Sequence, residues 1–189
     1  MNKTSKFIAV ASALVLTGGL AACTNTPNAT QNTSPAAAAP AVDITKTPET
    51  VVSQNRISVS ASAKAVQAAI AKCVEDKVPF VTVALVDRFG TVQAILRGDN
   101  AAEHTIETAK RKAYTAAAFG APTSELAGRI TGQGPSIADL PGTIFLAGGV
   151  PLKVDGVSIA GIGVGGAPDG KVDEACATAG AEAIAGANS

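Results

Sequence analysis

Residues 80–97 read FVTVALVDRFGTVQAILR, and this stretch decides the fold. Phe80 to Val86 form an apolar run rich in β-branched residues, Asp87 to Gly90 carry the composition of a turn, and Thr91 to Arg97 resume an apolar pattern. Two such runs joined by a short turn are typical of a β-hairpin. The sequence therefore predicts two antiparallel strands at this place.

Helical patterns lie on both sides of the hairpin. One helix is expected to run from a cap at Ser60 or Ser62 to about Lys77, since Pro79 prevents its continuation. An Ala-rich helix is expected over 101–119, capped by Asp99 or Asn100 and ended by Gly120. A short helix near 124–130 and a final helix capped by Asp173 complete the set.

A second strand region follows the long helix. Residues 144–147 and 150–154 favour strand, Asp155-Gly156 is a tight-turn signal, and residues 157–164 favour another strand. Hairpins surrounded by helices indicate an α+β domain with an antiparallel sheet rather than a doubly wound parallel sheet.

The first residues indicate export. Lys3 and Lys6 precede an apolar run over 7–16 that is too short for a permanent membrane span. Leu20-Ala21-Ala22-Cys23 then resembles the lipobox of bacterial lipoproteins, in which the cysteine becomes the lipidated first residue of the mature chain. The alternative is an ordinary secretory signal with an unrelated cysteine. Thr24 favours, by the same resemblance, the periplasmic face of the outer membrane.

These features divide the chain into three parts. Residues 1–22 are the expected lipoprotein signal peptide. Residues 23–54 are expected to contain the lipidated cysteine, which carries palmitate-like acyl chains, and a Pro- and Ala-rich tether. Residues 55–189 are expected to form one domain of ordinary size. The whole chain has 15 basic and 15 acidic residues, and removal of the two lysines of the signal peptide leaves a net charge of −2. That balance argues against a nucleic-acid binder.

Two cysteines remain besides Cys23. Cys73 and Cys176 each lie on the apolar face of an expected helix. Either both are separate buried thiols, or they form a disulfide between the first and last helices in an oxidising compartment. The sequence leaves both interpretations open.

The expected helix over 101–119 carries a polar stripe. His104, Thr108, Lys112 and Thr115 are spaced by four, four and three residues and so share one face. The stripe is either a solvated face or the wall of a ligand site. His104 is the single histidine of the chain, and one histidine suffices as a haem axial ligand.

The other motifs in the sequence are weaker indications of function. Residues 161–166 match GxGxxG, with Glu182 21 residues after Gly161, but a dinucleotide site needs a further strand after the helix, and only seven residues follow Glu182. The glycines are better explained by a close approach of the backbone. No HExxH, CxxC or zinc-type His/Cys spacing is present in the sequence.

Several segments stand out in order along the chain: 81–90, 97–101, 109–116, 146–152 and 161–167, before Asp173-Glu174. This ordered set, which covers nearly all of residues 57–187, resembles the GlcG/HbpS-like family of haem-binding and haem-degrading domains. It implies a profilin-like, three-layer α/β/α fold with about five antiparallel strands, and a homo-oligomer.

The same resemblance implies a ligand region. Arg97 to Asp99 and Lys112 to Thr115 would border it, and the loop with Gly148 and Gly149 would face it. Arg97 and Lys112 would then pair with haem propionates, while Thr115 or His104 would approach the iron. Gly98 and Gly165 depart from residues common in the family.

The leading functional expectation is a lipid-anchored, periplasmic binding protein for haem or a related tetrapyrrole, in haem handling or redox sensing. A second hypothesis is a cofactor-free oligomeric module that binds a partner protein. A third is an enzyme that degrades haem or processes a small hydroxy acid. No general base is recognisable beside a nucleophile in the sequence, which places the enzyme below the other two.

Overall fold

The computed structural model describes residues 41–130 and 135–186. The chain divides into two units, Met1–Lys46 and Thr47–Ser189, and the second contains every helix and strand of the described residues. The predicted signal peptide, Cys23 and residues 24–40 of the predicted tether lie outside the described residues. No described helix is long and apolar enough to cross a bilayer.

The first helix, α1, spans Val59–Glu75. Its cap is Ser58, whose hydroxyl accepts a hydrogen bond from the backbone N–H of Ala61 at 3.2 Å. The predicted caps Ser60 and Ser62 are therefore wrong. Both lie inside the helix, and Ser62 is fully buried on the face that packs against the rest of the domain.

The predicted hairpin is confirmed. Strand β1, Thr82–Asp87, pairs antiparallel with β2, Val92–Arg97. The carboxylate of Asp87 closes the turn, because its Oδ1 accepts hydrogen bonds from the backbone N–H groups of Phe89 and Thr91, both at 2.9 Å. An aspartate that binds the backbone in this way is a common turn residue.

Two further strands, β3 (Gly149–Val154) and β4 (Val157–Gly165), complete an antiparallel sheet in the order β2-β1-β4-β3. The α+β class is confirmed, but the described residues contain four strands instead of about five. Residues 144–147 are not a strand, since the Ile144 N–H donates to the hydroxyl of Thr115 on a helix, and Phe145 packs edge-on against Phe119 with ring centroids 5.4 Å apart.

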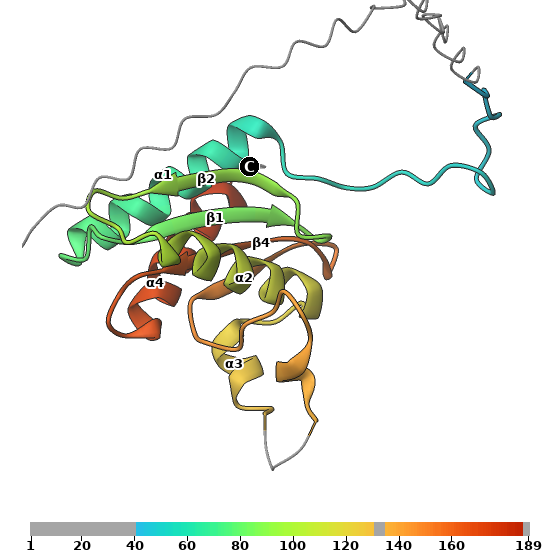
Figure 1. The fold of residues 1–189 in the computed structure, drawn as a ribbon. Coiled ribbons are helices and arrows are strands. Elements are labelled where there is room, and N and C mark those ends of the chain that lie inside the picture. The colour runs from blue at the N-terminus through green and yellow to red at the C-terminus, as the bar shows by residue number, and fades with distance from the viewer. Residues whose placement is uncertain (1–40, 131–134, 187–189) are drawn as a thin grey trace, which may run out of the picture. The chain divides into compact units, whose positions relative to one another are not determined.

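Helix α2, His104–Phe119, lies on one face of the sheet, and α1 and α4 (Gly170–Ala185) lie on the other, as Figure 1 shows. The three-layer architecture is therefore confirmed. Gly161 and Gly163 of β4 allow α2 to lie close, because a Cβ on either would fall 2.2 or 2.3 Å from a carbonyl oxygen of α2. These glycines of the GxGxxG sequence thus serve helix-on-sheet packing.

Two predicted caps differ from the structure. Helix α2 begins at His104, beyond the predicted caps Asp99 and Asn100, because Asn100 has a positive φ of 60° and turns the chain before the helix. Helix α4 is capped by Asp169, whose Oδ1 accepts from the Lys171 N–H at 2.9 Å. The predicted cap Asp173 lies one turn later and faces the interior.

The main core lies between the sheet and the α1/α4 layer. It is built from Ala, Val, Ile and Leu, with Val83, Leu85 and Ile162 fully buried. Cys73 of α1 and Cys176 of α4 form a disulfide with Cα atoms 5.5 Å apart. Of the two interpretations of these cysteines, the structure has the disulfide. Short helices α3 (Thr123–Ala127) and η1 (Ile137–Asp139) lie between α2 and β3.

Candidate functional site

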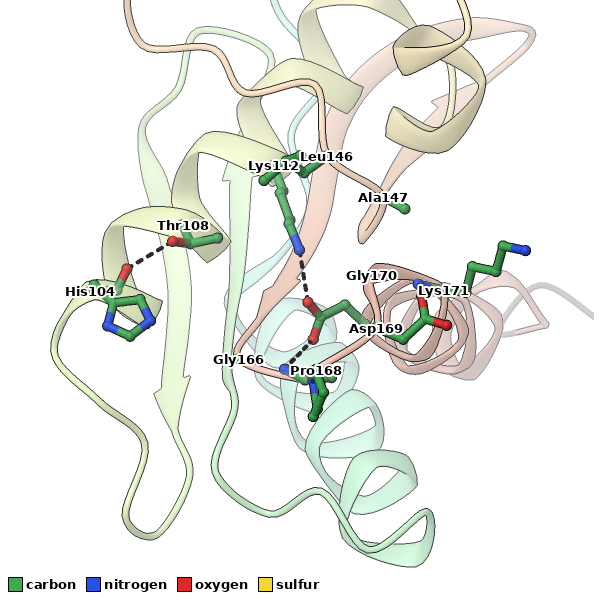
Figure 2. A pocket seen from close by; sticks show the side chains of 12 residues that line it. His104, Thr108, Lys112, Leu146, Ala147, Gly166, Pro168, Asp169, Gly170 and Lys171 are labelled. Carbon is green, nitrogen blue, oxygen red and sulfur yellow. Dashed lines mark hydrogen bonds and ion pairs between the residues drawn. The ribbon is translucent and has the colours of Figure 1, made fainter.

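A pocket of about 540 Å³ opens where the start of α2 faces the start of α4. Figure 2 shows its walls, which come from α2, from the segment before β3 and from the turn between β4 and α4. Twelve residues line it: His104, Thr108, Lys112, Leu146, Ala147, Gly166, Ala167, Pro168, Asp169, Gly170, Lys171 and Asp173. Its volume is within the range of small-molecule and cofactor sites.

A buried ion pair forms the floor of the pocket. The Nζ of Lys112 on α2 lies 2.7 Å from Oδ2 of Asp173 on α4, and the two side chains are 4% and 2% exposed. The other carboxylate oxygen, Oδ1, accepts the backbone N–H of Ala167 at 3.0 Å. Asp173 thus joins α2, α4 and the turn that precedes α4. Because both charges are paired and hydrogen-bonded, they are tolerated in the interior.

Burial dominates the electrostatics of this pair. It raises the pKa of Asp173 above its usual value, because desolvation penalises the carboxylate. The ion pair with Lys112 and the hydrogen bond from Ala167 act in the opposite direction and offset only part of this effect.

Gly148 and Gly149 leave room for the ion pair. Gly148 has φ +129°, and a Cβ there would lie 2.7 Å from the Lys112 Nζ and 2.8 Å from the Asp173 Cβ. A Cβ on Gly149 would lie 2.4 Å from the Lys112 carbonyl oxygen. The Gly149 N–H donates to the hydroxyl of Thr123 at 2.8 Å. The two glycines therefore lie beside the pocket floor, behind the ion pair, and line no part of the cavity.

Three of the four predicted stripe residues line the pocket. His104 is exposed at its mouth, Thr108 is half-buried with its hydroxyl donating to the His104 carbonyl at 2.9 Å, and Lys112 is at the floor. The interpretation of the stripe as a solvated face is wrong for Lys112 and Thr115, because both side chains are buried. Whether His104, Thr108 and Lys112 bind a ligand stays a prediction.

Thr115 and Arg97 do not reach this pocket. The Thr115 side chain is fully buried, and its hydroxyl donates to the Arg111 carbonyl at 2.8 Å while it accepts the Ile144 N–H at 2.9 Å. The Arg97 guanidinium donates to the Ala101 carbonyl at 2.8 Å and lines a separate hollow beside α1. The structure therefore does not bring Arg97 and Lys112 together for the two propionates of one ligand.

Sequence reasoning missed part of the pocket. Lys171, Leu146 and Pro168 all line it, and so does Asp173, which the sequence predicts only as a helix cap. The signal that could have identified the region is the Gly-Gly-Ala-Pro-Asp-Gly sequence over 165–170, which places a turn between a strand and a helix. The partner of Asp173 is 61 residues away in sequence, and no local pattern marks it.

The lining combines the imidazole of His104, the cation of Lys171, the carboxylate of Asp169, and the apolar surfaces of Leu146, Ala147 and Pro168. Leu146 is 56% exposed. Within residues 41–130 and 135–186, no three His, Cys, Asp or Glu side chains are grouped closely enough to hold a metal ion by themselves. The arrangement suits an apolar ligand that has carboxylates on one edge and one centre that accepts a nitrogen donor.

Comparison with known proteins agrees with the fold. The family model described as "Haem degrading protein HbpS-like" matches residues 57–182. A crystal structure of HbpS is similar, with a TM-score of 0.70 and 43% identity over 75% of this chain and 99% of that one. A double mutant of HbpS from Streptomyces reticuli gives a TM-score of 0.72 and 43% identity, over 77% and 98% of the two chains.

A more distant similarity is to the structure of a PduOC:heme complex. The TM-score is 0.60 and the identity 28%, over 68% of this chain and 95% of that one. The Klebsiella pneumoniae protein ORFY, at 22% identity and a TM-score of 0.63, shows the same fold. No curated protein sequence gives a significant match to this chain.

Proposed function

The chain belongs to the HbpS-like family of haem-degrading proteins, and on this basis we propose that its domain binds haem in the pocket between α2 and α4. Two comparisons support the proposal: the family description, and the haem complex of a relative that shares the fold. The pocket supplies a third support, because its lining has the chemistry that haem requires.

The residues present fit such a group. Haem has a flat apolar body, one iron that accepts a nitrogen ligand, and two carboxylates on one edge. His104, the single histidine of the chain, lies at the mouth and offers the imidazole. Lys171 offers a cation for a propionate, and Leu146 and Pro168 offer apolar contact. The presence of His104 in this pocket is the observation that carries the proposal.

The residues have distinct roles in this proposal. His104 would hold the iron, which would supply redox chemistry when haem is bound. Lys171 orients the ligand by its carboxylate edge. Lys112 has a different role from the predicted propionate contact, since its ammonium already pairs with Asp173. The paired charges form a closed floor that contributes no net charge to the buried side of the pocket.

The site of action in the cell is also a proposal. The lipobox-like Leu20-Ala21-Ala22-Cys23 supports a lipid-anchored protein on the periplasmic face of the outer membrane. Haem handling or redox sensing outside the cytosol fits that placement. A homo-oligomer stays a prediction from the family resemblance, and the binding of a partner protein stays the second hypothesis.

A haemin titration tests the proposal. The full chain, purified in mild detergent, is titrated with haemin while the Soret band is followed. We expect haemin binding to shift the Soret band. His104→Phe should abolish or change this shift, because phenylalanine keeps an aromatic ring but has no nitrogen to bind the iron. Lys171→Ala should weaken binding, whereas Lys64→Ala, at an exposed lysine of α1 outside the pocket, should not. Unchanged binding in His104→Phe would refute the assignment of His104.

Turnover is a separate question from binding. The family is described as haem-degrading, so the haem-loaded chain is incubated with a reductant in air and the Soret band is followed over time. Loss of the band in the wild type, but not in a haem-loaded control protein, would make the domain an enzyme. A stable band would make it a binding or sensing protein.

A further inference from the structure

One end of the sheet presents apolar side chains to solvent. Phe89, in the turn between β1 and β2, is 65% exposed, and Val157, at the start of β4, is 61% exposed. Both line one shallow hollow, so they lie close together although 68 residues separate them in sequence. Val154, the partner of Val157 across the second turn, is 41% exposed. We call Phe89, Val154 and Val157 with Arg88 the turn end.

The turn end is held firmly in place. Asp87 fixes the first turn, because its Oδ1 accepts the backbone N–H groups of Phe89 and Thr91. Arg88 bridges to the other hairpin, because its backbone N–H donates to the Ile159 carbonyl at 3.0 Å and its Nη1 donates to the Ser158 carbonyl at 3.1 Å. Apolar side chains held in solvent by a rigid backbone are typical of a contact surface.

The N-terminal segment enters the domain at this same end. The Nη2 of Arg56 donates to Oε1 of Gln93 at 2.8 Å and lies 3.9 Å from Oδ2 of Asp87. Gln54 and Asn55 line the same hollow as Phe89 and Val157. In Figure 1 the start of α1 and both hairpin turns lie on one side of the domain. The described chain therefore enters the domain beside the turn end, at residues 54–56.

We propose that the turn end docks on the surface of the phospholipid bilayer that holds the lipid anchor. Thirty residues lie between Cys23 and Gln54. Their Pro- and Ala-rich composition predicts an unstructured tether, and a tether of that length has a root-mean-square reach of about 30 Å. An anchored domain is thus held at a high effective concentration next to the membrane, so that a weak contact becomes populated. Phenylalanine and valine side chains enter the interfacial region of a bilayer favourably.

Charge contributes little to this contact. Arg88 and Asp155 place one exposed charge of each sign at the two turns, and Asp87 already has Arg56 nearby. Docking should therefore depend on the apolar side chains and differ little between neutral and anionic vesicles or between low and high salt.

The proposed contact fixes the direction in which the pocket faces. Strand β4 runs from Val157 at the turn end to Gly165, and Gly166 lines the pocket. Nine residues of strand span about 25–30 Å. A domain that rests on its turn end would thus hold the mouth of the pocket away from the membrane, open to ligands from the aqueous phase. The proposal uses the predicted anchor at Cys23 and does not depend on haem binding.

A single introduced indole tests the contact, because the chain has no tryptophan. Phe89→Trp is made in the full chain and mixed with vesicles of phosphatidylethanolamine and phosphatidylglycerol that contain brominated acyl chains. We expect its emission to shift to the blue and to be quenched. The matched control is Phe80→Trp, at a 38% exposed phenylalanine just before β1, on the opposite end of the sheet. Its emission should not change.

Further measurements separate the causes. Cys23→Ala in the Phe89→Trp background should reduce vesicle binding by about 10²-fold, because the anchor supplies the effective concentration. Equal quenching of both indoles, or quenching of neither, would overturn the proposal. So would a Phe89→Trp emission that is already blue-shifted without vesicles and unchanged by them, since a second copy or another protein would then cover the turn end.

Discussion

Asp173 on α4 binds Lys112 on α2 at 2.7 Å across the floor of the pocket, and its second oxygen holds the backbone N–H of Ala167. One carboxylate thus ties the two helices that face the pocket to the turn that forms its third wall. The geometry of the pocket therefore depends on a pair of charges that no ligand needs to touch.

Loss of one partner of this pair should destabilise the domain strongly. Lys112→Met leaves the carboxylate of Asp173 buried without a counter-charge, and removing one member of a buried pair costs about 3–5 kcal/mol. Lys112→Met combined with Asp173→Asn removes both charges and should cost less than the sum of the two single variants. Urea denaturation of the four proteins measures the coupling. Strictly additive effects would show that the pair contributes no coupling.

The protonation of Asp173 should be measurable directly. Burial places its pKa above the ordinary 3.8, so a carbon-13 NMR titration of the carboxyl group should give a midpoint above that value. Because the native state holds this proton more tightly than the unfolded state, the contribution of Asp173 to stability is complete below pH 3.8 and is lost as the pH rises through the native pKa. Lys112→Met should raise the midpoint further. A midpoint below 3.8 would contradict the dominance of burial.

Much of the fold could be predicted from the sequence because periodicity and turn residues are local signals. The stretch 80–97 places two apolar runs on either side of an Asp-Arg-Phe-Gly turn and forms the expected hairpin. Residues 144–147 have an equally apolar composition but form no strand, because the Thr115 hydroxyl and the Phe119 ring hold Ile144 and Phe145 instead. Such side-chain partners come from another element, and no local pattern shows them.

The candidate site was predicted in part for the same reason. Helical spacing correctly placed His104, Thr108 and Lys112 around one pocket. Thr115 has the same spacing, but it lies 11 residues, or about 16 Å, along the helix from His104. There the segment around Ile144 covers it. Spacing determines which residues share a face of a helix, whereas the loop that covers part of that face is set by tertiary packing.

Gly148 should tolerate no side chain. Gly148→Ala would place a methyl group 2.7 Å from the Lys112 Nζ at a φ of +129°, so backbone strain and overpacking add, and we expect a loss of about 3 kcal/mol or more. Gly156→Ala is the matched control, because Gly156 also has a positive φ, of 79°, but no atom lies within 4 Å of its Cβ position. That variant should lose only about 1 kcal/mol. If thermal or urea denaturation shows the same loss of stability in both variants, the Lys112–Asp173 pair moves aside for the methyl group at no cost in free energy.

The disulfide should contribute a large part of the stability. Cys73 and Cys176 are 103 residues apart and fully buried, and a cross-link that closes a loop of this length restricts the unfolded chain by up to about 4–5 kcal/mol. Cys73→Ala combined with Cys176→Ala should therefore lower the urea midpoint markedly and make it insensitive to dithiothreitol. The wild type should approach the same midpoint only after reduction under unfolding conditions, because the native bond is shielded between α1 and α4. If the double variant has the same urea midpoint as the oxidised wild type, the disulfide adds no stability beyond that given by the packing of α1 against α4.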